Sequence, residues 1–333
     1  MKAKILSLLK SHSTDYISGE EISRVFGISR TAVWKHVQKL RDDGYCIESH
    51  SRIGYRLLQA PDKLYQHELK DLLTGDIIGR NIVYHEVVDS TNVIARAMAL
   101  KGSEEGTVII AEEQTAGKGR MGRSWFSPAG QGLWFSIILR PQICPADAPK
   151  LTLVAAVAVA KTLREVGIQA GIKWPNDILI QGRKLAGILT EMNAEIDRVH
   201  YLVVGIGINV NLGEDVIPDE LASIATSMEE YTKNGVSRIR VLASLLNNFD
   251  SLYREFTEGG FRKILDAWKE MSVTLNRHVR VHTIGSTDEG VAFDIDEEGA
   301  LILMKEDGSM KRILAGEVSL RDQIYENTLH EGI

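Results

Sequence analysis

The chain has few cysteines and no long apolar run, and each absence excludes a class of protein. Its two cysteines, Cys46 and Cys144, form neither a disulfide framework nor a zinc-ligand spacing. No apolar stretch reaches the ~18 residues of a membrane helix, and the N-terminus lacks the apolar core of a signal peptide. We therefore expect a cytoplasmic protein without membrane association, in which both cysteines are small packed residues.

The composition is that of an ordinary globular protein, but the charge is unevenly distributed. A length of 333 residues predicts two or three domains. The net charge is −6, yet residues 1–60 carry 10 Lys and Arg against 6 Asp and Glu, and the remainder carries 29 against 39. A basic N-terminal segment on an acidic body indicates that this segment meets a polyanion.

The first sixty residues predict a winged helix-turn-helix. Helices are expected over Met1–Lys10, Ser18–Phe26 and Arg30–Asp43, with serine N-caps and glycine stops for the last two. Ile47–Leu57 follows as a β-hairpin with a polar tip, and the linker Gln59–Lys63 ends the domain.

In such a module the second helix of the motif enters the major groove with its N-terminal residues on the base edges. Arg30 is the best candidate for base readout, because a guanidinium can bond two acceptors of guanine. Arg41 is expected to contact phosphate, and Trp34 can instead belong to the core. The residues expected to contact DNA are Ser29, Arg30, Thr31, Trp34, Lys35, Lys39 and Arg52. Some winged helices bind proteins, so that alternative stays open at this point.

The most informative stretch is the glycine-rich loop at residues 117–123, which reads Gly-Lys-Gly-Arg-Met-Gly-Arg. Glycines let the backbone approach a ligand closely, and three cations on one short loop suit a polyphosphate or an acyl phosphate. The loop also matches the dinucleotide fingerprint, but that motif needs a following helix and an acidic residue about 20 positions on. Breakers and a strand over Leu133–Leu139 follow instead, so a dinucleotide loop is disfavoured, and a solvated basic hairpin tip remains the plain alternative.

Four further segments of the central body carry polar groups or glycines at structured positions. Asp89–Asn92 precedes a helix, so Ser90 or Thr91 is expected to cap that helix, or to hold a polar ligand group. The others are Lys173–Asp177, Arg183–Gly187, which contains Lys184, and Gly205–Asn209 inside a buried strand. A lysine before an apolar strand is usually a surface charge, whereas a functional one points inward to an anion. Glycine within a strand marks close approach of a ligand or of another backbone.

The last sixty residues predict a small β-barrel. Short alternating strands are expected at Val279–His282, Gly290–Asp296, Ala300–Met304 and Arg312–Glu317, separated by Gly and Asp turns.

Taken together and in this order, five segments resemble the motifs of one family, the bifunctional biotin–protein ligases that also repress the biotin operon. They are Asp89–Asn92, Gly117–Trp125, Lys173–Asp177, Arg183–Gly187 and Gly205–Asn209. The resemblance extends over the whole chain, although Lys118 stands where the family often has arginine, which keeps the charge and loses the bidentate fork. It implies an α+β chain of three domains: a winged helix-turn-helix at 1–62, a mixed α/β, class II synthetase-like ligase domain at 63–271 and an SH3-like β-barrel at 272–333.

The resemblance implies a two-step ligase that makes biotinyl-5′-AMP from biotin and ATP and passes biotin to a lysine of the biotin carboxyl carrier protein. Lys184 and Arg120 would serve the adenylate step, and Asp177 would meet the acceptor lysine. Residues implied to bind biotin, ATP or the adenylate are Ser90, Thr91, Asn92, Gln114, Gly117, Lys118, Gly119, Arg120, Arg123, Trp125, Lys184, Gly187, Gly205 and Asn209. Ser90, Thr91 and Gln114 would meet the ureido group, and Asn209 the adenine.

The resemblance also implies Mg²⁺ with the nucleotide, operator DNA as a partner and a homodimer in the adenylate-bound state. Asn176 is a guess for the magnesium region, and Glu317 and Arg321 either lie near the nucleotide or only pack. Two other functions compete: a ligand-sensing repressor without ligase activity, and a lipoate ligase or octanoyltransferase on the same catalytic fold.

Overall fold

A computed structural model describes residues 1–333 except 13, 214, 233–234, 284 and 321–333. The contacts divide the chain into two compact units, Met1–Lys63 and Leu64–Ile333. Within the described residues, none of the helices combines the length and the apolar character that a membrane crossing requires.

The first unit is a winged helix-turn-helix, as the sequence predicts. Its elements are α1 (Lys2–Ser11), α2 (Gly19–Phe26), α3 (Arg30–Asp42), β1 (Cys46–His50) and β2 (Gly54–Gln59). Ser18 and Ser29 cap α2 and α3 through their hydroxyls, and Gly27 ends α2 with φ at 63°. The small core is formed by apolar side chains of all three helices, such as Ile5, Ile22 and Val37.

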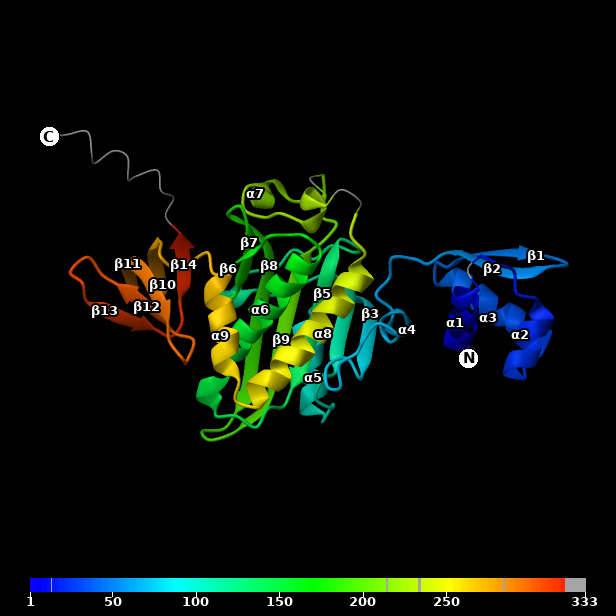
Figure 1. Ribbon diagram of the computed structural model, residues 1–333, viewed down its shortest axis with the longest axis horizontal. Coiled ribbons are helices and arrows are strands. Elements are labelled where there is room, and N and C mark those ends of the chain that lie inside the picture. The colour runs from blue at the N-terminus through cyan, green and yellow to red at the C-terminus, as the bar shows by residue number, and fades with distance from the viewer. Residues whose placement is uncertain (13, 214, 233–234, 284, 321–333) are drawn as a thin grey trace. The chain divides into compact units, whose positions relative to one another are not determined.

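The second unit is built on a seven-stranded sheet in the order β3-β4-β5-β9-β8-β7-β6 (Figure 1). Only β3 and β4 pair in parallel; the other pairs are antiparallel. The strands are β3 (Ile82–Val88), β4 (Val108–Gln114), β5 (Gly132–Leu139), β6 (Gly171–Lys173), β7 (Asp177–Ile180), β8 (Arg183–Ala194) and β9 (Val199–Asn209). This mixed sheet confirms the predicted α/β class of the central domain.

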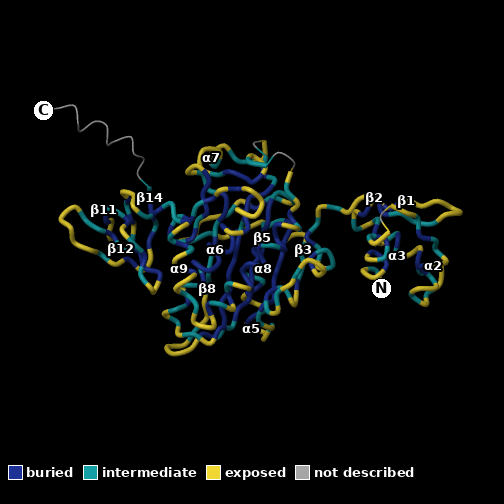
Figure 2. The backbone as a smooth tube through the Cα atoms, in the orientation of Figure 1, coloured by how far each residue is buried: buried dark blue, intermediate teal, exposed yellow. Residues whose placement is uncertain are grey.

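Helices cover both faces of the sheet. The helices are α4 (Gln66–Leu69), α5 (Thr91–Leu100), α6 (Lys150–Glu165), α7 (Asp219–Ala222), α8 (Arg238–Thr257) and α9 (Phe261–Glu270). The largely apolar α6 packs with α8 and α9 in the main core, which Figure 2 shows as a continuous buried layer. On the other face α5 packs on β4, β5 and β9 through a second apolar cluster that includes Ala95 and Ile109.

A five-stranded antiparallel sheet in the order β13-β12-β11-β10-β14 completes the second unit. Its strands are β10 (His278–Thr283), β11 (Ser286–Ile295), β12 (Leu301–Met304), β13 (Met310–Ile313) and β14 (Glu317–Leu320). The expected strand Arg312–Glu317 is wrong as a single element, because the chain turns at 314–316 and pairs on opposite edges of the sheet. Cys46 and Cys144 are both exposed, so the expectation that they are packed is also wrong.

Candidate functional site

Most of the residues singled out in the central body line one cleft of the second unit. Helix α5, the loop after β4, the β6–β7 turn and the strands β8 and β9 contribute to it, and β14 closes one side. The predicted residues that line it are Ser90, Thr91, Asn92, Gln114, Lys118, Gly119, Arg120, Arg123, Trp125, Asn176, Asp177, Lys184, Gly187 and Gly205. Asn209 lines an adjoining pocket that shares Arg123, Trp125, Lys184 and Glu317 with the cleft.

The glycine loop is a folded hairpin loop between β4 and β5. Trp125 N donates to Gly117 O at 2.8 Å, and Gly119 N donates to Arg123 O at 2.8 Å. The tip is a 3₁₀ turn, Arg120–Gly122, in which Met121 has φ at 55°. A strand follows this loop, so no helix N-terminus faces a ligand there and the dinucleotide interpretation is wrong.

Gly117 is the first residue of this loop, and its backbone runs very close to neighbouring atoms. A Cβ atom there would lie 2.4 Å from Trp125 O, a distance that real Cβ atoms do not reach. The glycine is therefore required by packing of the loop on itself.

Five cationic side chains of the described residues line the cleft: Lys118, Arg120, Arg123, Lys173 and Lys184. Lys184 Nζ lies 2.6 Å from Asp177 Oδ1 and 5.2 Å from the centre of the Trp125 ring. Arg120 Nη1 donates to Asn176 Oδ1 at 3.1 Å, and Arg123 Nη2 donates to Glu317 Oε2 at 2.6 Å. Since Lys184 lies inside the cleft at the Asp177 carboxylate, its alternative role as a plain surface charge is disfavoured.

Another of these cations is Lys173, to which the sequence alone assigned no role. Burial lowers the pKa of Lys173, although the Asp177 carboxylate opposes that shift. Burial likewise lowers the pKa of Arg120, again against Asp177. Within the described part of the chain, two carboxylates, Asp177 and Glu317, line the cleft. Two partly desolvated cations in this surplus of positive charge favour an anionic ligand.

A hydrogen-bonded polar group forms the closed end of the cleft. Gln114 Oε1 accepts from Thr91 N at 2.9 Å and from Thr91 Oγ1 at 3.1 Å. Gln114 Nε2 donates to Ser127 Oγ at 2.9 Å, which fixes the orientation of the amide. Ser90 is the N-cap of α5, but its hydroxyl makes no capping bond, so side-chain capping by Ser90 is a wrong expectation.

Behind these residues lies Ser136, a buried serine that sequence reasoning missed. Its Oγ is 2.7 Å from Thr91 Oγ1 and 2.6 Å from Asn92 Oδ1. Asn92 Nδ2 in turn donates to Glu191 Oε2 at 2.8 Å. The group is thus supported by a second layer of polar contacts that holds Thr91 and Asn92 in one orientation.

Glycines in β8 and β9 make room for the side chains of this site. A Cβ at Gly205 would lie 2.0 Å from Asn92 Oδ1, and one at Gly207 would lie 2.5 Å from Trp125 Nε1. A Cβ at Gly187 would be 3.0 Å from the Trp125 ring. The close approach expected at the strand glycines is therefore made by side chains of the cleft itself.

Asn209 ends β9 and is buried at the wall of the adjoining pocket. Its Nδ2 donates to Thr226 O at 2.9 Å, which leaves Oδ1 as the acceptor for a ligand. Leu212, Ile224 and Ala225 supply an apolar wall beside it. A flat ring with an exocyclic amine suits this combination of apolar faces and one amide oxygen.

The side-chain amide of Asn176, the residue named for the magnesium region, already makes two hydrogen bonds. Oδ1 accepts from Arg120, and Nδ2 donates to Ile188 O at 2.8 Å. Across the described residues, no three His, Cys, Asp or Glu side chains gather in a way that could hold a metal ion. Arg321, the other open assignment, lies outside the described residues.

In the first unit, all seven residues expected to contact DNA are exposed. Trp34 is 52% exposed, so the alternative that it belongs to the core is wrong. Arg30 forms an ion pair with Glu20, and Ser29 Oγ accepts from Ala32 N as the N-cap of α3. Arg41 instead donates to Ile47 O at 2.7 Å and so fastens β1 to α3, which disfavours its expected phosphate contact.

Comparison with known proteins assigns families to all three parts of the chain. The family model described as the biotin/lipoate A/B protein ligase family matches residues 84–209. A model described as an HTH domain matches residues 2–56, and one described as the biotin protein ligase C terminal domain matches residues 274–321.

Relatives resemble the chain over nearly its whole length. The bifunctional ligase/repressor BirA of Bacillus subtilis is 42% identical, over 96% of this chain and 98% of the relative. The protein of that name from Escherichia coli is 33% identical, over 96% of each chain. Among solved structures, the biotin protein ligase of Aquifex aeolicus in complex with biotin and ATP matches with a TM-score of 0.63 and 32% identity, over 73% of this chain and 99% of that chain.

Proposed function

Since this chain belongs to the family of bifunctional biotin ligase/repressors, we propose that its cleft makes and holds biotinyl-5′-AMP and that the adenylate controls DNA binding by its winged helix. The chain is a biotin–protein ligase joined to a helix-turn-helix repressor domain. The observation that carries the assignment of the site is the convergence of Lys184, Arg120, Arg123 and Lys173 on one cleft with a polar closed end.

We assign the closed end of the cleft to biotin. Ser90, Thr91 and Gln114 present hydroxyl and amide groups that match the carbonyl and two N–H groups of a ureido ring. This places the carboxylate of biotin toward Lys184 and Arg120.

The adjoining pocket is assigned to the adenosine of ATP, with Asn209 toward the adenine and Trp125 beside it. The α-phosphate then lies between the two ends, at Lys184. Magnesium would enter as the ion that accompanies ATP, and we assign no residue of the chain to it because the described residues form no such site.

In the first step an oxygen of the biotin carboxylate forms a bond to the α-phosphorus, and the bond to the pyrophosphate oxygen breaks. Negative charge grows on the phosphoryl oxygens, and fixed cations stabilise that charge without reorganisation. Lys184 is positioned for this by Asp177, and the loop that carries Lys118, Arg120 and Arg123 folds over the adenylate.

In the second step the ε-amine of an acceptor lysine attacks the activated carbonyl, the C–N bond forms and AMP leaves. Asp177 is the carboxylate nearest to Lys184 in the cleft, and we assign to it the recognition of the incoming amine. The acceptor is the biotin carboxyl carrier protein of acetyl-CoA carboxylase, by analogy with relatives such as the ligase of Mycobacterium tuberculosis, whose name specifies that carboxylase.

The repressor half is assigned to the first unit. Its exposed basic helix α3 would read an operator, and a homodimer would match a palindromic site once the adenylate is bound. We place both activities in the cytoplasm, where ATP and DNA meet.

Two variants test the assignment of the cleft in a pyrophosphate-release assay. Lys184→Ala should lose adenylate synthesis by about 100-fold or more, because a fixed charge on the reacting phosphate is removed. Arg120→Gly should still release pyrophosphate but let the adenylate escape, because the cover over it is weakened. Adenylate formation at the wild-type rate by Lys184→Ala would overturn the assignment, and lipoate used as readily as biotin would favour the lipoate alternative.

A further inference from the structure

We infer that Glu230 is a positioning residue of the ligase, which fastens residues 224–231 to β8 and thereby holds Lys184 and the adenosine pocket in register. The inference rests on the function proposed for Lys184 and Asn209. Glu230 lines neither the cleft nor the adjoining pocket, so its effect would pass through other residues.

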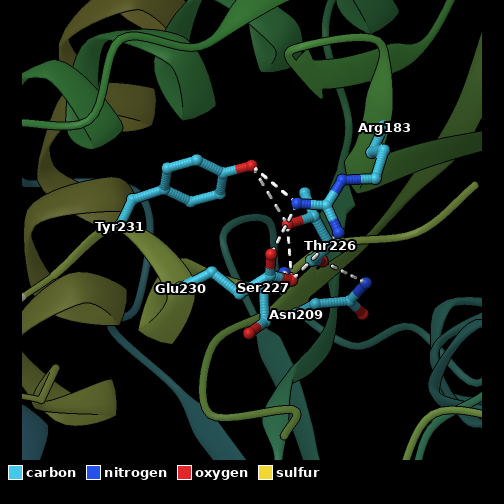
Figure 3. A network of polar contacts seen from close by, with 6 residues as sticks. All are labelled: Arg183, Asn209, Thr226, Ser227, Glu230 and Tyr231. Atoms are coloured by element: carbon cyan, nitrogen blue, oxygen red, sulfur yellow. Dashed lines mark hydrogen bonds and ion pairs between the residues drawn. The ribbon is translucent and has the colours of Figure 1, made fainter. Parts of the chain in front are cut away.

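Glu230 is the centre of a polar network that joins three parts of the chain, as Figure 3 shows. Arg183 Nη2, at the start of β8, donates to Glu230 Oε2 at 2.5 Å and to Tyr231 Oη at 3.1 Å. Thr226 Oγ1 donates to Glu230 Oε1 at 2.7 Å. The Glu230 side chain also completes a capping box with Ser227 at the 3₁₀ turn Met228–Tyr231. Oε2 therefore binds β8 alone, whereas Oε1 binds Thr226 and also accepts from Arg183 Nη1 at 3.5 Å.

The backbone next to this network carries Lys184. Lys184 N donates to Ile224 O at 2.7 Å, and Thr226 N donates to Lys184 O at 3.0 Å. The backbone of Lys184 is thus hydrogen-bonded to residues 224–226. The side chain of Arg183, the preceding residue, binds the same segment through Glu230. Loss of the Arg183–Glu230 contact would free the segment that fixes the Lys184 backbone.

The same segment positions the adenosine pocket. Thr226 O accepts from Asn209 Nδ2 at 2.9 Å, while Ile224 and Ala225 form the apolar wall. Thr226, Ser227 and Met228 are fully buried, so this part of the segment is packed rather than solvated. The Glu230 carboxylate therefore positions both the apolar wall of the adenosine pocket and the Asn209 amide.

The ionisation of the network agrees with this role. Burial alone would raise the pKa of Glu230, but hydrogen bonds from Thr226 and Arg183 outweigh it and hold the pKa below its ordinary value. The hydrogen bond to Glu230 raises the pKa of Arg183. The pair is therefore fully charged at neutral pH.

Glu230→Gln tests the contact of Glu230 with Arg183 separately from its contacts with Thr226 and Ser227. The glutamine keeps an oxygen for Thr226 and Ser227 but presents an amide donor to the Arg183 guanidinium, so the ion pair between β8 and the turn is lost and the bond from Arg183 to Tyr231 Oη remains. We expect the KM for ATP to rise about fivefold, as for one partly exposed charged hydrogen bond, with the KM for biotin within twofold of wild type. Arg183→Met should give the same pattern, and the double variant should be no worse than either single variant.

Glu289→Gln is the matched control, because it removes a strand-to-strand ion pair with Arg280 in the C-terminal sheet. It should leave both Michaelis constants unchanged. An unchanged KM for ATP in Glu230→Gln would overturn the inference, as would equal increases for ATP and biotin, which indicate general loss of structure. If wild type and Glu289→Gln themselves release no pyrophosphate from biotin and ATP, the proposed function fails and the inference fails with it.

Discussion

At the scale of single residues, the cleft is defined by charge that the chain leaves uncompensated. Among the described lining residues, five cations, Lys118, Arg120, Arg123, Lys173 and Lys184, face two carboxylates, Asp177 and Glu317. In the proposed function a nucleotide phosphate supplies the missing negative charge, and its attraction would oppose the effect of the desolvation that lowers the pKa of Lys173 and Arg120. The same cations would attract other carboxylates as well as biotin, so we assign the selectivity for biotin to the polar closed end.

Ser136→Ala tests that closed end. The single proton of the Ser136 hydroxyl is shared between Asn92 Oδ1 and Thr91 Oγ1, and its loss leaves a buried acceptor short of a donor at a cost of about 1–3 kcal/mol. We expect the KM for biotin to rise about tenfold and the KM for ATP to stay unchanged in steady-state assays.

Ser244→Ala is the control for that variant, since it removes a serine hydroxyl that bonds Glu165 between α6 and α8. It should leave the KM for biotin unaltered. If Ser136→Ala bound biotin as wild type does, Ser136 would have no role in positioning Thr91 and Asn92.

Sequence patterns could identify functional residues where the residues next to them in the chain form a recognisable motif. The loop at 117–123 and Lys184 were of this kind. Ser136 and Glu230 were not, because each acts through residues more than forty positions away or across a turn whose path only the fold defines. Trp34 was ambiguous in the sequence because helix periodicity near a domain edge fits both a buried and an exposed face, and the structure exposes it.

At the scale of elements, a buried ion pair fastens the first residue of α8 to the central sheet. Arg238 Nη1 lies 2.9 Å from Glu112 Oε2 on β4 and 3.1 Å from Gly132 O on β5. Glu112 Oε1 also accepts from Leu64 N at 3.0 Å, at the start of the second unit. The Glu112 carboxylate therefore joins α8 and the chain at Leu64 to β4.

Arg238→Met should destabilise the second unit by about 3–5 kcal/mol, because it leaves the Glu112 charge buried without its cation. Urea unfolding followed by tryptophan fluorescence measures the change. Adding Glu112→Gln to the first variant should recover part of the loss, since the unpaired charge is then gone. A loss below about 1 kcal/mol for Arg238→Met would show that the pair does not hold α8 to the sheet.

The helices and buried strands could be predicted from the periodicity of their apolar residues, whereas the turns between apolar strands could not. The run Ile313–Ala315 reads as one strand, yet the chain turns before β14. At Gly316 a Cβ would lie 2.8 Å from Val281 Cγ1, so the tight passage beside β10 requires glycine. Such a contact is made by residues distant in sequence, and local pattern could not reveal it.

At the scale of the whole molecule, two compact units with opposite charge balance serve two kinds of partner. The basic first unit presents Arg30, Lys35 and Lys39 exposed on α3, and the acidic second unit gathers five cations in its cleft. This division explains how one chain can bind DNA and nucleotide without one polyanion occupying the site of the other.

The measurement that tests the central claim most directly is a titration of duplex DNA from the control region of the biotin-synthesis genes of the organism that encodes this chain. With biotin and ATP present, wild type should bind this DNA at least tenfold more tightly than without them, because in the proposed function the adenylate made in the cleft favours a DNA-binding dimer. Lys184→Ala should show no such increase. Equal affinity of wild type with and without biotin and ATP would contradict the account.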